Sequence, residues 1–184
     1  MKKTTIIIII ALFNITASAQ KYFTRSGRIV FFSKAPVENI EATNNEVSSI
    51  LDTQKGDVVF IVLVKSFKFK KALMEEHFNE NYMESATYPK AKFKGKIDNI
   101  SSVNFSKDGV YNVNVTGQLE IHGVTKPITT QGTITVKGGS VSAKSNFSVL
   151  LADYGIVIPK LVADNISKSV DITVDVNYQP MPTE

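Results

Sequence analysis

The sequence predicts an all-β domain of antiparallel strands, on two observations. First, apolar and polar residues alternate along several segments. Residues 170–178 carry an apolar side chain at every even position and a polar one at every odd position, a period of two that is typical of a strand with one buried face. Second, turn signals such as Lys107-Asp108-Gly109 and Gly138-Gly139 separate these segments, and such short glycine turns join antiparallel neighbours.

The expected strands number about eight and are joined mainly by short turns. A further turn is expected at Lys55-Gly56-Asp57. Gly132 falls on the apolar face of its strand, which indicates a bend or a close backbone approach. By residue number, the expected strands are 27–33, 47–52, 57–65, 91–103, 111–119, 128–136, 141–149 and 170–178.

One segment, from Lys70 to Met83, departs from this alternation. Its apolar residues are spaced as on one face of a helix, and glutamates occupy many of the other positions. Pro89 then disfavours a helical conformation at Tyr88. We therefore expect a short helical insertion around residues 70–83, with its apolar face formed by Leu73, Met74, Phe78 and Tyr82.

About eight antiparallel strands with one helical insertion fit a closed barrel or a two-sheet sandwich. Two features favour the barrel. Residues 58–64 are apolar at every position, so we expect both faces of that strand to be buried. Large apolar side chains are also numerous for so small a domain. An eight-stranded barrel is either filled by its own side chains or holds one small ligand, and composition alone leaves both open.

Residues 1–19 have the pattern of a cleaved signal peptide. Lys2 and Lys3 precede an apolar run from Ile6 to Phe13, and Ala17-Ser18-Ala19 matches the small-x-small cleavage pattern. The run is shorter than the roughly 20 residues of a membrane span, although an uncleaved anchor is the alternative. No later stretch is long and apolar enough to span a membrane. Residues 20–184 are therefore expected to form one soluble domain in the periplasm or outside the cell.

Composition excludes several classes of protein. The chain has no cysteine, which rules out disulfides, thiol catalysis and a lipid-modified N-terminal cysteine. Without residues 1–19, 19 basic residues remain against 17 acidic ones. The lysines are spread along the chain without a basic stripe, so no nucleic-acid partner is expected. About 165 residues suffice for a single core.

Few residues suit catalysis or metal binding. The only two histidines, His77 and His122, lie far apart in the sequence. No Gly-x-Ser-x-Gly elbow, zinc-binding cluster, calcium loop or phosphate-binding glycine loop is present. The sequence therefore predicts no catalytic residue, no metal site and no cofactor.

Motifs in the expected order nevertheless resemble one family. Residues 117–127 read Gly-Gln-Leu-Glu-Ile-His-Gly-Val-Thr-Lys-Pro, which is similar to the Gly-x-Leu-Thr-Ile-His-Gly-Val-Thr-Lys-Pro signature of the YceI-like family. Residues 88–93 match that family's Tyr-Pro-x-Ala-x-Phe motif. Residues 73–85 resemble its helical segment and residues 27–33 its first strands. Together the motifs span nearly all of residues 20–184.

The chain also departs from the family pattern. Residues 149–155 correspond to the family's Asn-Arg-x-Asp-Phe-Gly stretch, but an apolar residue stands at the arginine position. Lys70 and Lys71 lie several residues before His77, where the family often has an arginine next to the histidine. If the arginine of the Asn-Arg-x-Asp-Phe-Gly stretch normally meets a polar head group, the resemblance does not carry the family's head-group preference over to this chain.

The resemblance implies a lipocalin-like barrel with a hollow interior that holds a polyisoprenoid or a similar long-chain lipid, in an exported binding protein that is not an enzyme. His77 and Tyr88 are the polar candidates for the mouth, and residues 122–127 are expected to shape a strand corner. The residues expected to line the lipid tunnel are Phe60, Val62, Phe67, Met74, Phe78, Phe93, Tyr111, Val113, Phe147 and Tyr154.

Two alternatives stay open at this point. Instead of a lipid carrier, the protein could be a lipid-modifying enzyme with His77 or His122 as general base, or an interaction protein whose barrel is packed solid. The sequence identifies neither the lipid nor the oligomeric state, and a homodimer is one assembly that it allows.

Overall fold

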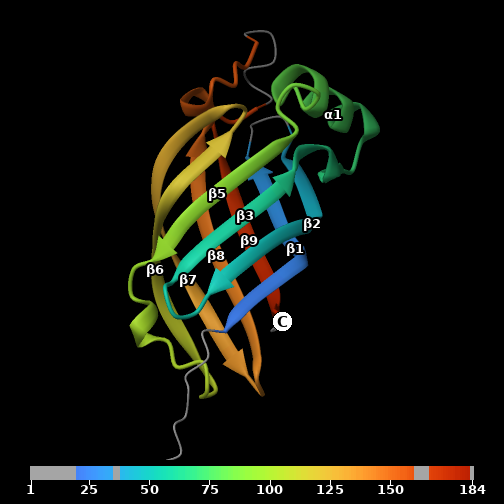
Figure 1. The fold of residues 1–184 in the computed structure, drawn as a ribbon. Coiled ribbons are helices and arrows are strands. Elements are labelled where there is room, and N and C mark those ends of the chain that lie inside the picture. Colours follow the sequence, from blue (N-terminus) through green and yellow to red (C-terminus); the bar gives the residue numbers. More distant parts are fainter. Residues whose placement is uncertain (1–19, 35–37, 160–165, 183–184) are drawn as a thin grey trace, which may run out of the picture.

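The computed structural model describes residues 20–34, 38–159 and 166–182. The expected signal peptide lies outside these residues and stays a prediction. Within the described residues, eight long strands form the body of the protein (Figure 1). They are β1 (Lys21–Ser33), β2 (Ile40–Asp52), β3 (Asp57–Leu63), β5 (Lys90–Ile97), β6 (Gly109–Ile121), β7 (Val124–Lys137), β8 (Ser140–Leu150) and β9 (Ser169–Pro180).

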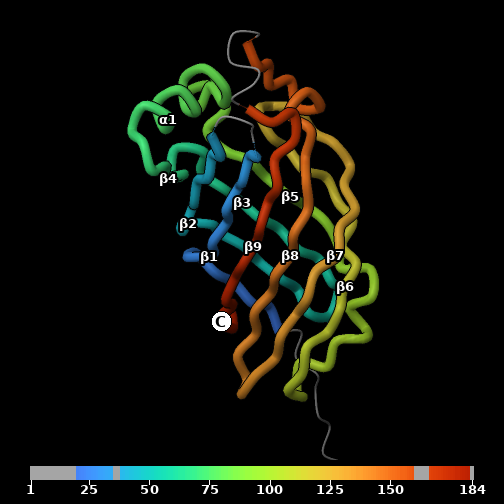
Figure 2. Tube along the Cα trace, turned by 180° about the vertical axis from the view of Figure 1, so that it is seen from behind, coloured from blue at the N-terminus to red at the C-terminus, as the bar shows by residue number. Residues whose placement is uncertain are grey.

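These strands close into an antiparallel barrel, which confirms the predicted fold class. The order around the barrel is β1-β9-β8-β7-β6-β5-β3-β2, and β2 pairs again with β1. Figure 2 shows β9, β8 and β7 side by side on the face opposite to that of Figure 1. β2 pairs with β3 only over Ser48–Leu51, and its first half pairs instead with the two-residue strand β4 (Lys68–Phe69).

Strands β1 and β2 are longer than their sequence patterns predict. β1 begins at Lys21, but register shifts between Thr24 and Ile29 interrupt its alternation. Such bulges insert a residue and move the following side chains to the other face. β2 begins at Ile40, and its inward positions include the polar side chains Asn44 and Ser49. Both effects hide the period of two from the sequence.

The predicted helical insertion is also confirmed. It consists of the short helix α1 (Ala72–His77) and a π-helical turn, η2 (Phe78–Tyr82). It lies at one end of the barrel, after β4 and before β5 (Figure 1). The described residues contain no helix that is long and apolar enough to cross a membrane.

One expectation about β3 is wrong. Its continuous apolar run predicts burial on both faces, yet Ile61 and Leu63 are each 41% exposed. Their neighbours Val62 and Val64 point inward and are buried. A barrel wall is a single layer of strands, so its outer face is buried only where something else covers it, and no other described element packs over the outer side of β3.

Candidate functional site

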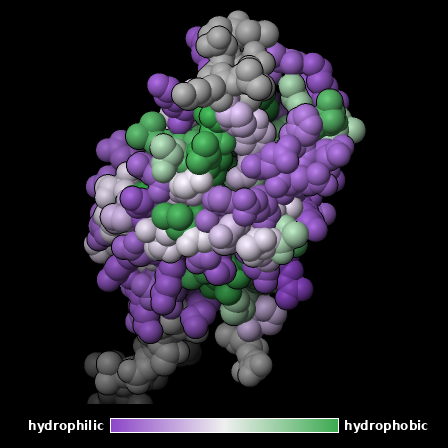
Figure 3. Space-filling model, turned by 90° about the horizontal axis from the view of Figure 1, so that it is seen from above, coloured by the Kyte–Doolittle hydropathy of each residue, from purple (hydrophilic) through white to green (hydrophobic). Residues whose placement is uncertain are grey.

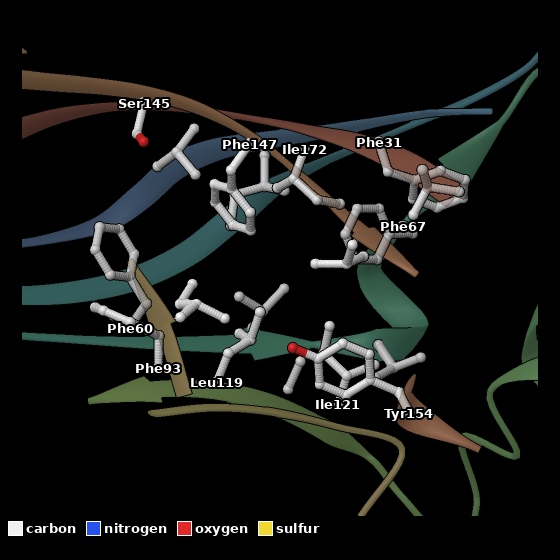
Figure 4. A pocket seen from close by; sticks show the side chains of 18 of the residues that line it. Phe31, Phe60, Phe67, Phe93, Leu119, Ile121, Ser145, Phe147, Tyr154 and Ile172 are labelled. Carbon is white, nitrogen blue, oxygen red and sulfur yellow. The ribbon is translucent and has the colours of Figure 1, made fainter. Parts of the chain in front are cut away.

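The barrel encloses a cavity of about 460 Å³, which fits the size of small-molecule sites in proteins, and every long strand contributes side chains to its wall. Figure 4 shows Phe60, Phe93 and Ser145 toward one end of this cavity and Phe31 and Phe67 toward the other. The wall is almost entirely apolar because the inward positions of the alternating strands carry aliphatic and aromatic residues. This cavity excludes the alternative of a solidly packed barrel.

Two facing glycines give Phe93 its place in the wall. Gly95 of β5 pairs directly with Gly117 of β6. A methyl group on Gly117 would lie 2.6 Å from Cζ of Phe93, and one on Gly95 would also collide with that ring. The ring of Phe93 therefore lies over a strip of bare backbone, where a close approach needs glycine.

The helical insertion closes one end of the cavity with aromatic side chains. Phe78 of η2 stacks on Phe31 of β1 at 5.4 Å between ring centroids. It also contacts Phe67 at 5.7 Å and Phe69 at 5.0 Å. Aromatic pairs at these distances stabilise a fold beyond the burial of their area. Four rings from β1, η2, β4 and the residue before β4 thus form an aromatic plug at this end.

Polar groups in the wall gather where β7 and β8 part. The ladder between these strands runs only from Gly132–Ser145 to Lys137–Ser140. At the point of separation, Ser145 Oγ donates a hydrogen bond to the carbonyl of Gln131 at 2.7 Å, and Thr130 Oγ1 lies 3.3 Å from Ser145 Oγ. Both hydroxyls belong to residues that line the cavity.

A second polar spot is the hydroxyl of Tyr178, which is 2.8 Å from Ser49 Oγ. Tyr178 is only 6% exposed. Burial raises the pKa of its phenol to about 12, although the hydrogen bond to Ser49 acts in the opposite direction. The group is therefore neutral at physiological pH. The neutral phenol adds no charge to the cavity wall, and its hydrogen bond is already made inside the protein.

Tyr154 reaches the cavity from the 3₁₀ turn η4 (Leu151–Tyr154), which follows β8. Its ring points into the space shown in Figure 4 and the residue is 3% exposed. Burial raises the pKa of its phenol, with a smaller contribution from Asp153. The backbone carbonyl of Tyr154 lies 3.2 Å from Nδ1 of His122, so the strand corner at His122 is connected to the cavity wall.

The cavity contains most of the residues that the sequence nominates. Tyr111 and Val113 are exceptions: Val113 is buried outside the lining, and the Tyr111 hydroxyl donates to the carbonyl of Lys107 at 2.9 Å. Both lie on the part of β6 beyond the cavity, and side-chain type alone does not reveal depth along a strand. The nominated residues in the wall are Phe60, Val62, Phe67, Met74, Phe78, Phe93, Phe147 and Tyr154; their contact with a ligand stays a prediction.

The two polar candidates for the mouth lie in different places. His77 is exposed and borders the cavity beside α1, together with Glu38. Tyr88 is not part of the lining, and its ring packs edge-on against His122 at 4.6 Å. His122 is also absent from the lining. The two histidines therefore share no site, and neither forms with described His, Cys, Asp or Glu residues a group that could hold a metal ion.

Sequence reasoning missed several wall residues. Ile172 lies on an expected strand with clear alternation, so the same pattern could have identified it. Phe31 lies just after the register shift in β1. Thr130 and Ser145 occupy inward positions of their strands, in step with Ile128 and Ala143, so the period of two could have identified them, although a hydroxyl is not a residue type expected in an apolar wall.

Comparisons with known proteins agree with this architecture. A solved polyisoprenoid-binding domain from Saccharophagus degradans, described as implicated in plant cell wall breakdown, superposes with a TM-score of 0.77 at 17% identity, over 89% of this chain and 99% of that one. BcnA of Burkholderia cenocepacia gives 0.68 at 18% identity, over 83% and 96%. A Campylobacter jejuni YceI protein gives 0.57 at 16% identity, over 82% and 90%.

At these identities the structural likeness concerns the fold. No curated protein matched the chain in a sequence search. The model of the YceI-like domain, however, matches residues 16–178, which include the strands, the helical insertion and the His122 corner. The chain belongs to the YceI-like domain family.

Proposed function

We propose that the protein is an exported carrier that holds a polyisoprenoid or a similar long-chain lipid inside its barrel. The observation that carries this proposal is the cavity of about 460 Å³ inside the barrel, with its almost wholly apolar wall. The similarity to a polyisoprenoid-binding domain supports the same class of ligand. The expected signal peptide supports a place of action beyond the inner membrane.

Burial of the lipid's hydrocarbon chain supplies the affinity of the protein for its ligand. Each methylene group removed from water contributes roughly 0.8 kcal/mol, so ten of them contribute about 8 kcal/mol before the entropic cost of binding is subtracted. Phe60, Phe93 and Phe147 provide flat aromatic surface for such a chain. A long apolar tail thus binds without polar recognition along most of its length.

The polar end of the ligand is expected at the α1 end of the cavity. A charged head group loses its hydration when it is buried without a partner, at a cost of several kcal/mol. The inner polar groups, Ser145, Thr130 and Tyr178, already make hydrogen bonds with protein atoms. His77 and Glu38 are exposed where they border the cavity, so a head group beside them stays in water.

The test is to identify what the purified protein carries. Extraction into organic solvent followed by mass spectrometry should yield a long-chain amphiphile, and an apolar fluorescent probe should compete with it. Ile172→Asn places an amide in the cavity wall, whereas Thr173→Asn changes the exposed neighbour on the same strand. Only the first variant should lose probe affinity. A protein that carries no amphiphile and binds no apolar probe would contradict the proposal.

A further inference from the structure

The outer face of the barrel over β2, β3 and β5 has an unusual composition. Ile50, Ile61 and Leu63 are 45%, 41% and 41% exposed. They lie on adjacent strands, because Ile50 pairs with Val59 and Ser48 pairs with Ile61. Other large apolar side chains of comparable exposure among the described residues lie at separate places: Leu73, Val110, Leu150 and Val157.

A ladder of lysines borders these apolar residues. β5 places Lys90, Lys92, Lys94 and Lys96 on its exposed face, with the intervening residues turned toward the interior. The register sets Leu63 opposite Lys90 and Ile61 opposite Lys92. Each aliphatic side chain of β3 thus lies directly beside a lysine of β5. We call the surface formed by Ile50, Ile61, Leu63 and these four lysines the basic apolar face.

Part of this positive charge has an acidic neighbour on the same face, since Lys96 lies opposite Asp57 in the β3–β5 ladder. Lys90 and Lys94 have no acidic neighbour in register. Lys92 forms an ion pair with Glu120 at 3.0 Å. No ion pair joins Lys90, Lys94 or Lys96 to a carboxylate of the described residues. Four like charges at alternate positions of one strand repel one another, and a negatively charged partner would relieve that repulsion.

The opposite side of the barrel has a different surface. Exposed positions of β7 to β9 carry hydroxyls and amides, among them Thr125, Thr129, Asn146, Ser148, Thr173 and Asn177. The exposed lysines of this side are scattered: Lys126 and Lys137 lie near the two ends of β7, and Lys144 is paired with Asp175 at 2.8 Å. Seen from above, the end of the molecule has green apolar atoms mainly near its middle and purple hydrophilic atoms around much of its rim (Figure 3). The two sides of one closed sheet therefore differ in chemistry.

We propose that the basic apolar face docks the protein on an anionic lipid bilayer. Lysines within a Debye length of anionic head groups are attracted to them, and exposed aliphatic residues enter the boundary between head groups and acyl chains. Contiguous apolar surface with a polar rim marks an interaction site. Charge selects the bilayer as occupant, because a second copy of the chain would place lysines against the same face of its partner.

The face reaches the end of the barrel that carries α1. Leu63 and Lys90 are the residues of β3 and β5 next to the helical insertion. The mouth bordered by His77 and Glu38 lies at this same end. A docked protein would therefore hold the mouth close to the membrane surface. Docking itself uses outward side chains and does not depend on what the cavity holds.

Co-sedimentation with vesicles tests the proposal. Vesicles of phosphatidylcholine and phosphatidylglycerol at 3:1 should retain the purified protein, whereas pure phosphatidylcholine vesicles should not. Retention should fall when the salt concentration rises, because exposed charges are screened. Lys90→Gln with Lys94→Gln should weaken binding about 25-fold, since each lysine near an anionic surface accounts for about a fivefold change.

The aliphatic residues need their own variant and a matched control. Ile61→Thr with Leu63→Thr keeps strand-forming residues and should also reduce retention. Lys126→Gln with Lys137→Gln removes the same charge from β7 and should bind like the unchanged protein. Unchanged binding of the apolar probe in all these variants shows that barrel and cavity are intact, so this test and that of the proposed function fail separately.

Two results would overturn the proposal. One is that the anionic and the neutral vesicles retain the protein equally, or that neither retains it. The other is a dimer in analytical ultracentrifugation that Ile61→Thr with Leu63→Thr dissociates, since a second copy of the chain would then cover the face.

Discussion

The imidazole of His122 lies edge-on to the ring of Tyr88, with 4.6 Å between the ring centroids and 66° between the planes. The two residues come from different segments, the β6–β7 hairpin and the loop before β5. His122 has a positive φ of 51°, and its Nδ1 donates to the carbonyl of Tyr154. One side chain therefore connects the hairpin, the loop before β5 and η4.

This connection predicts a stability effect at His122. Asparagine tolerates a positive φ, so His122→Asn removes the ring without new backbone strain. Loss of the aromatic contact and of the bond to Tyr154 should lower the free energy of unfolding by about 1–2 kcal/mol. Denaturant unfolding measures this change. The control is His77→Asn, whose exposed ring predicts almost no effect; equal losses in both variants would contradict this role.

Gly123 provides a second test of the same corner. It has a φ of 74°, and a methyl group there would lie 2.6 Å from Cε1 of Tyr88. Gly139 has a φ of 79° with no atom near that position. Gly139→Ala therefore costs backbone strain alone, about 1 kcal/mol. Gly123→Ala should cost at least about 1 kcal/mol more because the Tyr88 ring must move. Thermal unfolding of the two variants compares these costs directly, and equal costs would show that Tyr88 yields freely.

Phe78 should control both stability and the retention of an apolar probe. It contacts Phe31, Phe67 and Phe69 in the aromatic plug. Phe78→Ala should lower the free energy of unfolding by about 2 kcal/mol and should accelerate dissociation of the probe, as stopped-flow fluorescence would measure. Leu73→Ala on α1 is the matched control, because Leu73 is 60% exposed. Unchanged probe dissociation in Phe78→Ala would place the exit elsewhere.

Tyr178 predicts how stability depends on alkaline pH. Its pKa is about 12 in the folded protein, against an ordinary value of 10.0. A raised folded pKa means that its contribution is complete below pH 10 and is lost as the pH rises toward 12, because the unfolded chain releases the proton first. The loss should be about 2–3 kcal/mol.

Tyr178→Phe should reduce this alkaline loss of stability, although the raised pKa of Tyr154 leaves part of it. At neutral pH the variant should cost about 1–2 kcal/mol, since Ser49 Oγ then lacks its partner inside the protein. Urea unfolding at a series of pH values measures both effects. An unchanged slope between pH 10 and 12 would show that the Tyr178 phenol is not the group responsible.

Most of the barrel could be predicted because alternation is a local property. β7, β8 and β9 have uninterrupted patterns, and the corresponding segments were identified close to their true limits. The predicted ranges of β1 and β2 are too short, because a bulge shifts the period in β1 and the inward positions of β2 include Asn44 and Ser49. A polar residue can face inward where a distant residue offers it a hydrogen-bond partner, as Tyr178 does for Ser49. The local sequence contains no information about such distant partners.

The candidate site was predicted less completely, for a geometric reason. Residue type identified large apolar side chains such as Phe60 and Phe147, and alternation placed them on the inner face. Neither gives the position along the barrel axis, which is why Tyr111 and Val113 were nominated although they lie beyond the cavity. The exposure of Ile61 and Leu63 was missed because an apolar run looks the same whether its second face meets protein or water.

The early end of the β7–β8 ladder makes the wall mechanically uneven. Above Gly132 and Ser145 the two strands share no ladder pairs, and η4 lies against β7 there. The β2–β3 ladder is also short, covering Ser48–Leu51, but β4 pairs with β2 beyond it. Along the unpaired part of β7 and β8, widening breaks no ladder hydrogen bond and separates only side-chain contacts, such as those of Ser145 with Thr130 and with the carbonyl of Gln131. The barrel wall therefore widens most easily where β7 and β8 are unpaired, and a wider ligand would be accommodated there first.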